Sequence, residues 1–157
     1  MQRFHALLIA PLAAGAPLFA RFTEGAWGLA PCALCLWQRW PYWAAAVLAL
    51  LAAGTRSRVL LALAGLAILV SAGLGGLHVG VEQGWWPSPL PACAAPAATA
   101  PVGGLDAMIA ALPARPSKPC DAPTFLVPGV PLSMAAMNLL YALVLGGAAL
   151  AGAARRR

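Results

Sequence analysis

Charged residues are scarce in this sequence. Lys and Arg contribute 10 of the 157 residues and Asp and Glu only 4, so charged side chains make up 9% of the chain. Soluble domains carry roughly a quarter of charged residues, and the scarcity excludes an ordinary water-soluble globule. The hydrophobic share of 62% excludes a disordered chain. A nucleotide-binding glycine fingerprint is also lacking, because Gly73-Leu74-Gly75-Gly76 lies in an apolar stretch, where small residues favour close helix packing.

Four apolar stretches lie between the few charges. A membrane-spanning helix needs about 20 apolar residues, with a range of roughly 17 to 25, and the bilayer forces each span to satisfy its own backbone hydrogen bonds. The sequence therefore predicts an all-α membrane protein, a four-helix bundle forming one integral-membrane domain over residues 1–157. The predicted helices cover residues 4–20, 36–54, 59–77 and 132–154, and the predicted outward loops cover residues 21–35 and 78–131. The first stretch also resembles a signal peptide at Ala14-Gly15-Ala16. It is long for one and no clear cleavage site follows, so we expect it to be retained.

Basic residues indicate the orientation of the bundle. Six of them lie at one set of helix ends, in very short segments: Arg3, Arg56, Arg58, Arg155, Arg156 and Arg157. The positive-inside rule is strongest for such segments, and it predicts that both termini are cytoplasmic. The net charge of +6 then reflects membrane orientation and not nucleic-acid binding. All six tryptophans lie toward the other end, as an interfacial belt does.

The second outward loop is rich in proline, with 11 of the 15 prolines of the chain. Proline removes a backbone donor and opposes helix, so this loop is not predicted to span the membrane. Within it, an apolar stripe at helical spacing runs from Leu105 to Leu112. We expect a short helix there, which either lies flat on the membrane surface or packs under its own loop.

All four cysteines lie in the outward loops: Cys32 and Cys35 in the first, Cys93 and Cys120 in the second. Disulfides persist outside the cytosol, and an even number predicts two of them. Three pairings are possible, of which Cys32–Cys35 with Cys93–Cys120 is the simplest. As a structural bridge, Cys93–Cys120 would contribute about 3 to 4 kcal/mol of stability in the chain-entropy model.

A Cys32–Cys35 disulfide would add little stability as a structural bridge, because it closes only four residues. A C-x-x-C motif of this kind is more typical of a redox centre. A zinc site of four thiolates is the other interpretation. It ranks lower, because Cys93 and Cys120 do not form a second close pair.

Arg39 lies four positions after Cys35, on the same helix face if the helix has begun there. A thiol near a helix N-terminus and a guanidinium is expected to have a depressed pKa. At the membrane interface Arg39 needs an anionic or carbonyl partner, and the alternative is an arginine that reaches to water. Pro41 as the first helical residue would place Cys35 in the loop instead.

These motifs resemble the bacterial disulfide-bond formation protein B (DsbB) family of membrane thiol oxidases. The resemblance rests on Pro31-Cys32-Ala33-Leu34-Cys35-Leu36-Trp37-Gln38-Arg39, on Pro87-Ser88-Pro89 followed by Cys93, on the distant Cys120, and on four apolar stretches. It covers essentially the whole chain and implies a multi-pass protein of the bacterial inner membrane with periplasmic cysteine loops.

The resemblance also implies a role for each cysteine. A reduced periplasmic thioredoxin-like oxidase of the DsbA type would attack Cys93, and Cys120 would then pair transiently with Cys32. Cys35 would be freed as a thiolate and would donate electrons to a quinone, either ubiquinone or menaquinone. Arg39 would stabilise the thiolate–quinone adduct and the charge on a quinone oxygen. The implied partners are thus the DsbA-like protein, membrane lipid and the quinone pool, with no nucleic acid.

His78 resembles a histidine near the quinone in this family and is a candidate cofactor-binding residue, although its spacing to Cys93 differs from the family pattern. Glu82 would orient it or relay protons. The alternative is an interfacial histidine bonded to water or backbone. Position 38 departs from the family, which has an acidic residue there, so Gln38 is assigned no proton-relay role.

A redox argument supports a quinone as electron acceptor. A DsbA-type partner has a potential near −120 mV and glutathione in oxidising compartments lies around −200 mV, so electron transfer to oxidised glutathione would run uphill by about 80 mV, or roughly 3.7 kcal/mol for two electrons.

Two other functions stay open. One is a non-catalytic membrane scaffold with two structural disulfides, and the other is a related thiol–quinone enzyme working toward substrate reduction.

Overall fold

The fold is all-helical over the part of the chain that the computed structural model describes, which is residues 2–93, 118–127 and 129–155. No β-strand occurs in these ranges, and one isolated bridge joins Phe125 to Ser133. The elements are α1 (Gln2–Trp27), α2 (Ala33–Trp37), α3 (Trp40–Thr55), α4 (Arg58–Glu82), η1 (Pro91–Cys93) and α6 (Met134–Ala154). The predicted all-α class is confirmed.

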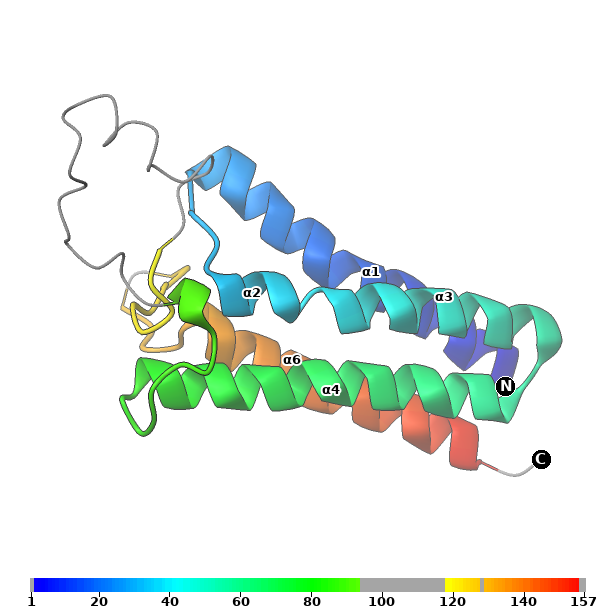
Figure 1. Cartoon of the computed structure of the whole chain (residues 1–157). Helices are drawn as coiled ribbons and strands as arrows, with labels where there is room; N and C mark the ends of the chain where they lie inside the picture. Colours follow the sequence, from blue (N-terminus) through cyan, green and yellow to red (C-terminus); the bar gives the residue numbers. More distant parts are fainter. Residues whose placement is uncertain (1, 94–117, 128, 156–157) are drawn as a thin grey trace, which may run out of the picture.

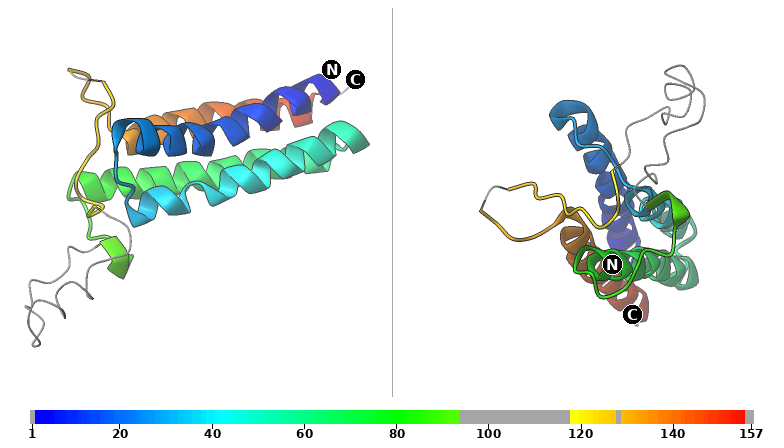
Figure 2. Two further views of the ribbon diagram at one scale, coloured as in Figure 1. Left: turned by 90° about the horizontal axis from the view of Figure 1, so that it is seen from above. Right: turned by 60° about the vertical axis from the view of Figure 1, so that its left-hand side comes forward.

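The long helices run side by side as a bundle (Figures 1 and 2). Both chain ends and the α3–α4 connection lie at one end, and the α1–α2 connection and η1 lie at the other (Figure 1). Three helices of the described ranges, α1, α4 and α6, are long and apolar enough to cross a membrane. The predicted short helix near Leu105 lies outside the described residues.

The predicted single helix over residues 36–54 is wrong, since this segment forms two helices. The five-residue α2 ends at Trp37, the N–H of the next residue, Gln38, donates to the carbonyl of Leu34, and α3 begins at Trp40. Pro41 lies in the first turn of α3. Its ring has no N–H to continue the hydrogen-bond ladder of α2, but its fixed φ suits a helix start. The interruption sets Gln38 and Arg39 between two helices.

Two helices extend further than the apolar stretches indicated. α1 continues to Trp27, so Glu24 is helical and not in the predicted loop over residues 21–35. α4 continues to Glu82, which places His78 inside a helix and not at the start of the predicted loop over residues 78–131. Each helix continues until a glycine with positive φ follows it: Gly28 at 65° and Gly84 at 70°. The hydrophobic pattern missed these last turns because their side chains are partly polar.

The bundle core is built from small side chains. Its buried residues are mostly alanines, while large apolar side chains such as Phe4, Leu50 and Val144 point outward. Such an arrangement is typical of helices packed in lipid, where small residues let the backbones approach. Gly75 shows the closeness of α4 and α6, since a Cβ there would lie 3.2 Å from the backbone nitrogen of Leu139. Gly75 therefore serves the close packing predicted for the Gly73–Gly76 segment.

Candidate active site

The four cysteines gather at the end of the bundle opposite the chain termini. Cys93 and Cys120 form a disulfide, as predicted. Both are buried in an apolar cluster that also contains Cys32, Leu34 and Val81. The fold thus brings a C-x-x-C motif from the start of α2 against a disulfide that connects η1 with the segment before α6.

Cys32 and Cys35 are free thiols in the structure, so the second predicted disulfide is not formed here. Their sulfurs lie 2.6 Å apart, so the pair needs little movement to form a disulfide. Cys32 caps α2, because its Sγ accepts a hydrogen bond from the backbone N–H of Cys35 at 3.1 Å. The short helix therefore fixes the pair in mutual contact.

The two thiols differ in acidity. The hydrogen bond from Cys32 is the largest cause that lowers the pKa of Cys35, which reaches about 7 against burial that raises it, with help from Lys118 and Arg39. The same hydrogen bond, together with burial, raises the pKa of Cys32 far above its ordinary value. The lowered pKa was expected for Cys35, but the expected cause, Arg39, is a minor one. Cys35 is the thiolate of the pair and Cys32 keeps the proton.

Arg39 is the charged group nearest to this chemistry on the α2–α3 connection. Its guanidinium pairs with Glu24 of α1, which supplies the anionic partner expected at an interface. Its Nε is buried and has no hydrogen-bond partner among the described residues. An unpaired buried donor is costly, and the Arg39 side chain that carries it also lines a cavity.

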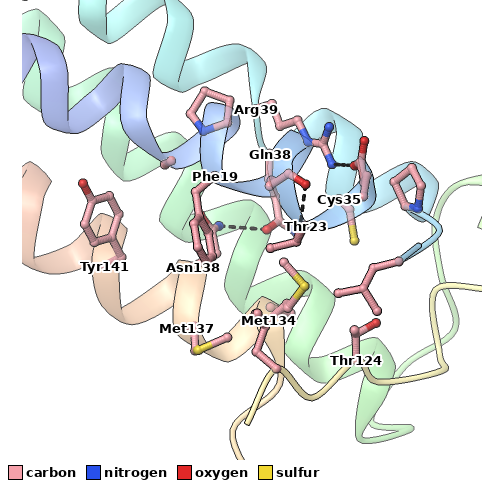
Figure 3. A pocket seen from close by; sticks show the side chains of 18 of the residues that line it. Phe19, Thr23, Cys35, Gln38, Arg39, Thr124, Met134, Met137, Asn138 and Tyr141 are labelled. Atoms are coloured by element: carbon pink, nitrogen blue, oxygen red, sulfur yellow. Dashed lines mark hydrogen bonds and ion pairs between the residues drawn. The ribbon is translucent and has the colours of Figure 1, made fainter. Parts of the chain in front are cut away.

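That cavity has a volume of about 410 Å³, within the range of small-molecule sites. It lies between α1, the α2–α3 connection and α6, and Cys35 and Arg39 lie at one end of it (Figure 3). Most of the lining is apolar, including Phe19, Met134 and Met137. An apolar cavity with a thiolate and a free N–H donor suits a flat, lipid-soluble molecule with an acceptor oxygen.

His78 is buried between the two cysteine pairs, with 2% of its surface exposed. Its Nε2 lies 3.6 Å from Sγ of Cys32 and 3.2 Å from the carbonyl oxygen of Cys120, and its Nδ1 lies 2.9 Å from Nε2 of Gln38. Glu82, one turn later, lies 3.9 Å from the ring. The alternative was an interfacial histidine bonded to water or backbone. A backbone carbonyl is indeed a partner of the ring, but the ring is buried and does not lie at an interface with water.

Sequence reasoning missed the polar chain behind His78. Asn138 donates to Oε1 of Gln38 at 2.8 Å, and the hydroxyl of Tyr42 donates to Oδ1 of Asn138 at 2.8 Å. A second contact joins Ser71 Oγ to the carbonyl of Gln38 at 2.8 Å. An available signal was that Asn138 and Ser71 are isolated polar residues in apolar stretches, where such residues are costly unless partnered.

A metal is the other ligand that these residues could hold. One ligand atom from each of Cys32, Cys35 and His78 lies within 4.8 Å of the others. The zinc site of four thiolates considered from the sequence is not assembled, because Cys93 and Cys120 are joined to each other.

Comparison with known proteins gives one finding. A family model described as disulfide bond formation protein DsbB matches residues 2–152, nearly the whole chain. Searches among curated proteins and solved structures find no significant match.

Proposed function

This chain belongs to the DsbB family, and we propose that it is a membrane thiol oxidase that reoxidises a DsbA-like periplasmic oxidase and passes the electrons to quinone. The observation that carries the proposal is the site around Cys35. Its thiol has a pKa of about 7, and Cys35 lines the same apolar cavity as Arg39, whose buried Nε has no partner among the described residues. A nucleophile, a donor and an apolar cavity are the parts that electron transfer from a thiol to quinone requires.

The Cys93–Cys120 disulfide is the proposed entry point for electrons. Cys93 retains 4% of its surface exposed and Cys120 none. A thiolate of the partner therefore reaches Cys93 first and forms a mixed disulfide with it, releasing Cys120 as a thiolate. Cys120 and Cys32 belong to one buried cluster, so this thiolate is released beside the C-x-x-C pair.

Cys35 is the proposed exit point. Attack of Cys120 on an oxidised Cys32–Cys35 pair releases Cys35, the more acidic thiol and hence the better leaving group. The positive charge of Arg39 supports the Cys35 thiolate, and its buried Nε–H has no acceptor among the described residues. His78 also lines the cavity and is a candidate contact at its cysteine end.

The residues fit a quinone. The cavity is apolar enough for its ring, and the buried Nε–H of Arg39 is a donor that a quinone oxygen would satisfy. When bound, a quinone supplies the two-electron acceptor that the thiols of this chain lack. Ubiquinone and menaquinone share the ring carbonyls that this donor would recognise.

We place the cysteine end of the bundle in the periplasm and both termini in the cytoplasm. Arg3, Arg56 and Arg58 lie at the end with the termini, in agreement with the positive-inside rule. A DsbA-like partner is periplasmic, so this orientation presents Cys93 to it.

The scaffold alternative, with two structural disulfides, is less well supported, because it gives no role to the apolar cavity that Cys35 and Arg39 line. A titration with reductant separates the two functions. The purified protein is treated with a mild dithiol, the dithiol is removed, ubiquinone is added without oxygen, and free thiols are mapped by mass spectrometry.

We expect both cysteine pairs to reduce readily and the Cys32–Cys35 disulfide to form on addition of quinone. The Cys35→Ala variant is expected not to reduce quinone. Resistance to the dithiol, or quinone reduction at an unchanged rate by the variant, would contradict the proposal. The same assay run with excess quinol and an oxidised partner tests the opposite direction of electron flow.

A further inference from the structure

His78 occupies a position between the two redox pairs that a cavity-lining role does not explain. Its Nε2 faces Sγ of Cys32 at 3.6 Å and the carbonyl oxygen of Cys120 at 3.2 Å. Because the ring is almost fully buried, these contacts are with the protein and not with water. One nitrogen therefore touches both residues between which the disulfide must pass.

The hydrogen bonds behind the ring determine which nitrogen carries the proton. The amide nitrogen of Asn138 lies 3.4 Å from the carbonyl oxygen of Ser71, which can only accept, and this contact fixes the orientation of the Asn138 amide. Asn138 then donates to Oε1 of Gln38, so the Gln38 nitrogen is the atom that faces Nδ1 of His78. Nδ1 accepts this hydrogen bond.

The remaining ring proton is thus on Nε2, where it is donated toward Cys120 and Cys32. Tyr42 completes the chain by donating to Oδ1 of Asn138. The charged or titratable groups near the ring are Cys32, Cys35 with its sulfur within 4.8 Å of a ring nitrogen, the Glu82 carboxyl at 3.9 Å and, through its charge, Lys118. Glu82 accepts from Ser133, which directs the carboxyl toward the α6 N-terminus.

We propose that His78 is a catalytic residue of the thiol–disulfide exchange between Cys120 and Cys32, where its Nε2 lies against Sγ of Cys32, the sulfur under attack, while its hydrogen bond to the Cys120 carbonyl holds the attacking residue in place. This inference rests on the proposed function. It adds a role in sulfur exchange to the place of His78 in the cavity lining.

The exchange balances without an outside reagent. The Cys120 thiolate attacks Sγ of Cys32 in the oxidised Cys32–Cys35 pair, the Cys32–Cys120 bond forms, the Cys32–Cys35 bond breaks, and the electron pair leaves on Cys35. The number of disulfides is conserved, and no proton is consumed. The oxidised pair is the product that quinone forms in the proposed function. Gln38 is a positioning residue here, because it acts only by holding Nδ1.

Two electron routes separate this role from a role at the quinone. In the full chain, a reduced thioredoxin-like partner must pass electrons through Cys93, Cys120 and Cys32. In a Cys93→Ser/Cys120→Ser background, dithiothreitol reduces Cys32–Cys35 directly, and the exchange step is bypassed. Anaerobic quinone reduction is followed by absorbance for both routes in wild type, His78→Leu and His78→Gln, with His5→Gln as the control for the other histidine of the chain.

We expect His78→Leu to slow the partner route by roughly 10-fold or more, the loss for leaving a buried hydrogen-bonding group without its partner, and to slow the dithiothreitol route by a smaller factor, because that route omits the exchange step. His78→Gln keeps an N–H donor and is expected to recover part of the partner route. Equal slowing of both routes, or of neither, would overturn the inference. Absence of quinone reduction by wild type on both routes would instead overturn the proposed function.

A measurement without substitution of His78 tests the same assignment if the leucine variant does not fold. The chain has two histidines, so ¹⁵N-histidine spectra of the detergent-solubilised protein contain two ring systems, which His5→Gln assigns. We expect the His78 proton on Nε2, and we expect this signal to shift when the Cys32–Cys120 disulfide is trapped in a Cys35→Ser variant. A proton on Nδ1, or a signal indifferent to the trapped disulfide, would refute the role.

Discussion

The acidity of Cys35 is predicted to depend on a single hydrogen bond from Cys32. The contact between the two sulfurs, at 2.6 Å, is the first cause of the lowered pKa of Cys35, and burial acts against it. Replacing Cys32 by alanine removes the donor and leaves the burial. The pKa of Cys35 is then expected to rise from about 7 to its ordinary value of 9.0 or above. Replacing Cys32 by serine keeps an O–H donor and is expected to preserve most of the lowering.

The size of the effect follows from the populations. At pH 7 about half of Cys35 is thiolate at a pKa of about 7, but roughly 1% at the ordinary value of 9.0, a loss of ~50-fold. A more basic thiolate is a better nucleophile, with a Brønsted coefficient of about 0.4–0.5, which returns roughly 6- to 10-fold over two pKa units. The net expectation is therefore a fall of about 5- to 8-fold in the rate of reaction with a small disulfide at pH 7.

The assay uses Cys35 as the only thiol, in proteins that carry Cys93→Ser, Cys120→Ser and either Cys32→Ala or Cys32→Ser. The rate of reaction with an aromatic disulfide is measured from pH 5 to pH 10. The alanine protein is expected to be slower at pH 7 but faster near pH 10, where both thiols are ionised, so the two profiles cross. Superimposable profiles would refute the claim that Cys32 sets the pKa of Cys35.

Three further predictions concern the cavity and the helix contacts. Arg39→Met and Arg39→Lys both remove the buried Nε donor and are expected to raise the KM for quinone by roughly 10-fold or more. The KM is measured by dithiothreitol-driven quinone reduction. An unchanged KM in both variants would exclude a contact between Arg39 Nε and quinone. Gly75→Ala is expected to destabilise the bundle by about 1–3 kcal/mol in thermal unfolding in detergent, whereas Gly73→Ala, which meets no atom within 4 Å, is expected to be neutral or stabilising. If both glycine variants melt alike, the close approach of α4 and α6 is wrong. Ser133→Ala removes both the cap of α6 and the donor to Glu82, whereas Ser57→Ala removes only the cap of α4. Ser133→Ala is therefore expected to lower the stability by about 1–3 kcal/mol more than Ser57→Ala. Equal losses of stability would show that the Glu82 contact contributes nothing.

The helices were predictable because their signal is long and local. Apolar runs of membrane length identified α1, α4 and α6, and the outward position of the cysteines led to the Cys93–Cys120 pairing. The break between α2 and α3 was partly visible in Pro41, which was considered as a helix start. Hydrophobicity alone could not locate helix ends, since polar last turns remain helical until a glycine such as Gly84 ends them.

The site was predictable as a set of residue types and not as an arrangement. Cys35 and Arg39 are close in sequence, so their proximity followed from helical spacing. Gln38, Asn138 and His78 come from three different elements, and their hydrogen bonds exist only after α4 and α6 pack on the α2–α3 connection. The burial of His78 likewise depends on the Cys120 segment folding over it. Such contacts have no signature in one sequence.

The central claim is that the Cys35 thiolate faces a quinone in the cavity beside Arg39. The most direct measurement is the visible absorption spectrum of purified, reduced protein on addition of ubiquinone without oxygen. We predict a charge-transfer band that is lost in Cys35→Ala and that grows with pH around the pKa of about 7. Bound quinone without a band while Cys35 is ionised, or a band that persists in Cys35→Ala, would contradict the account.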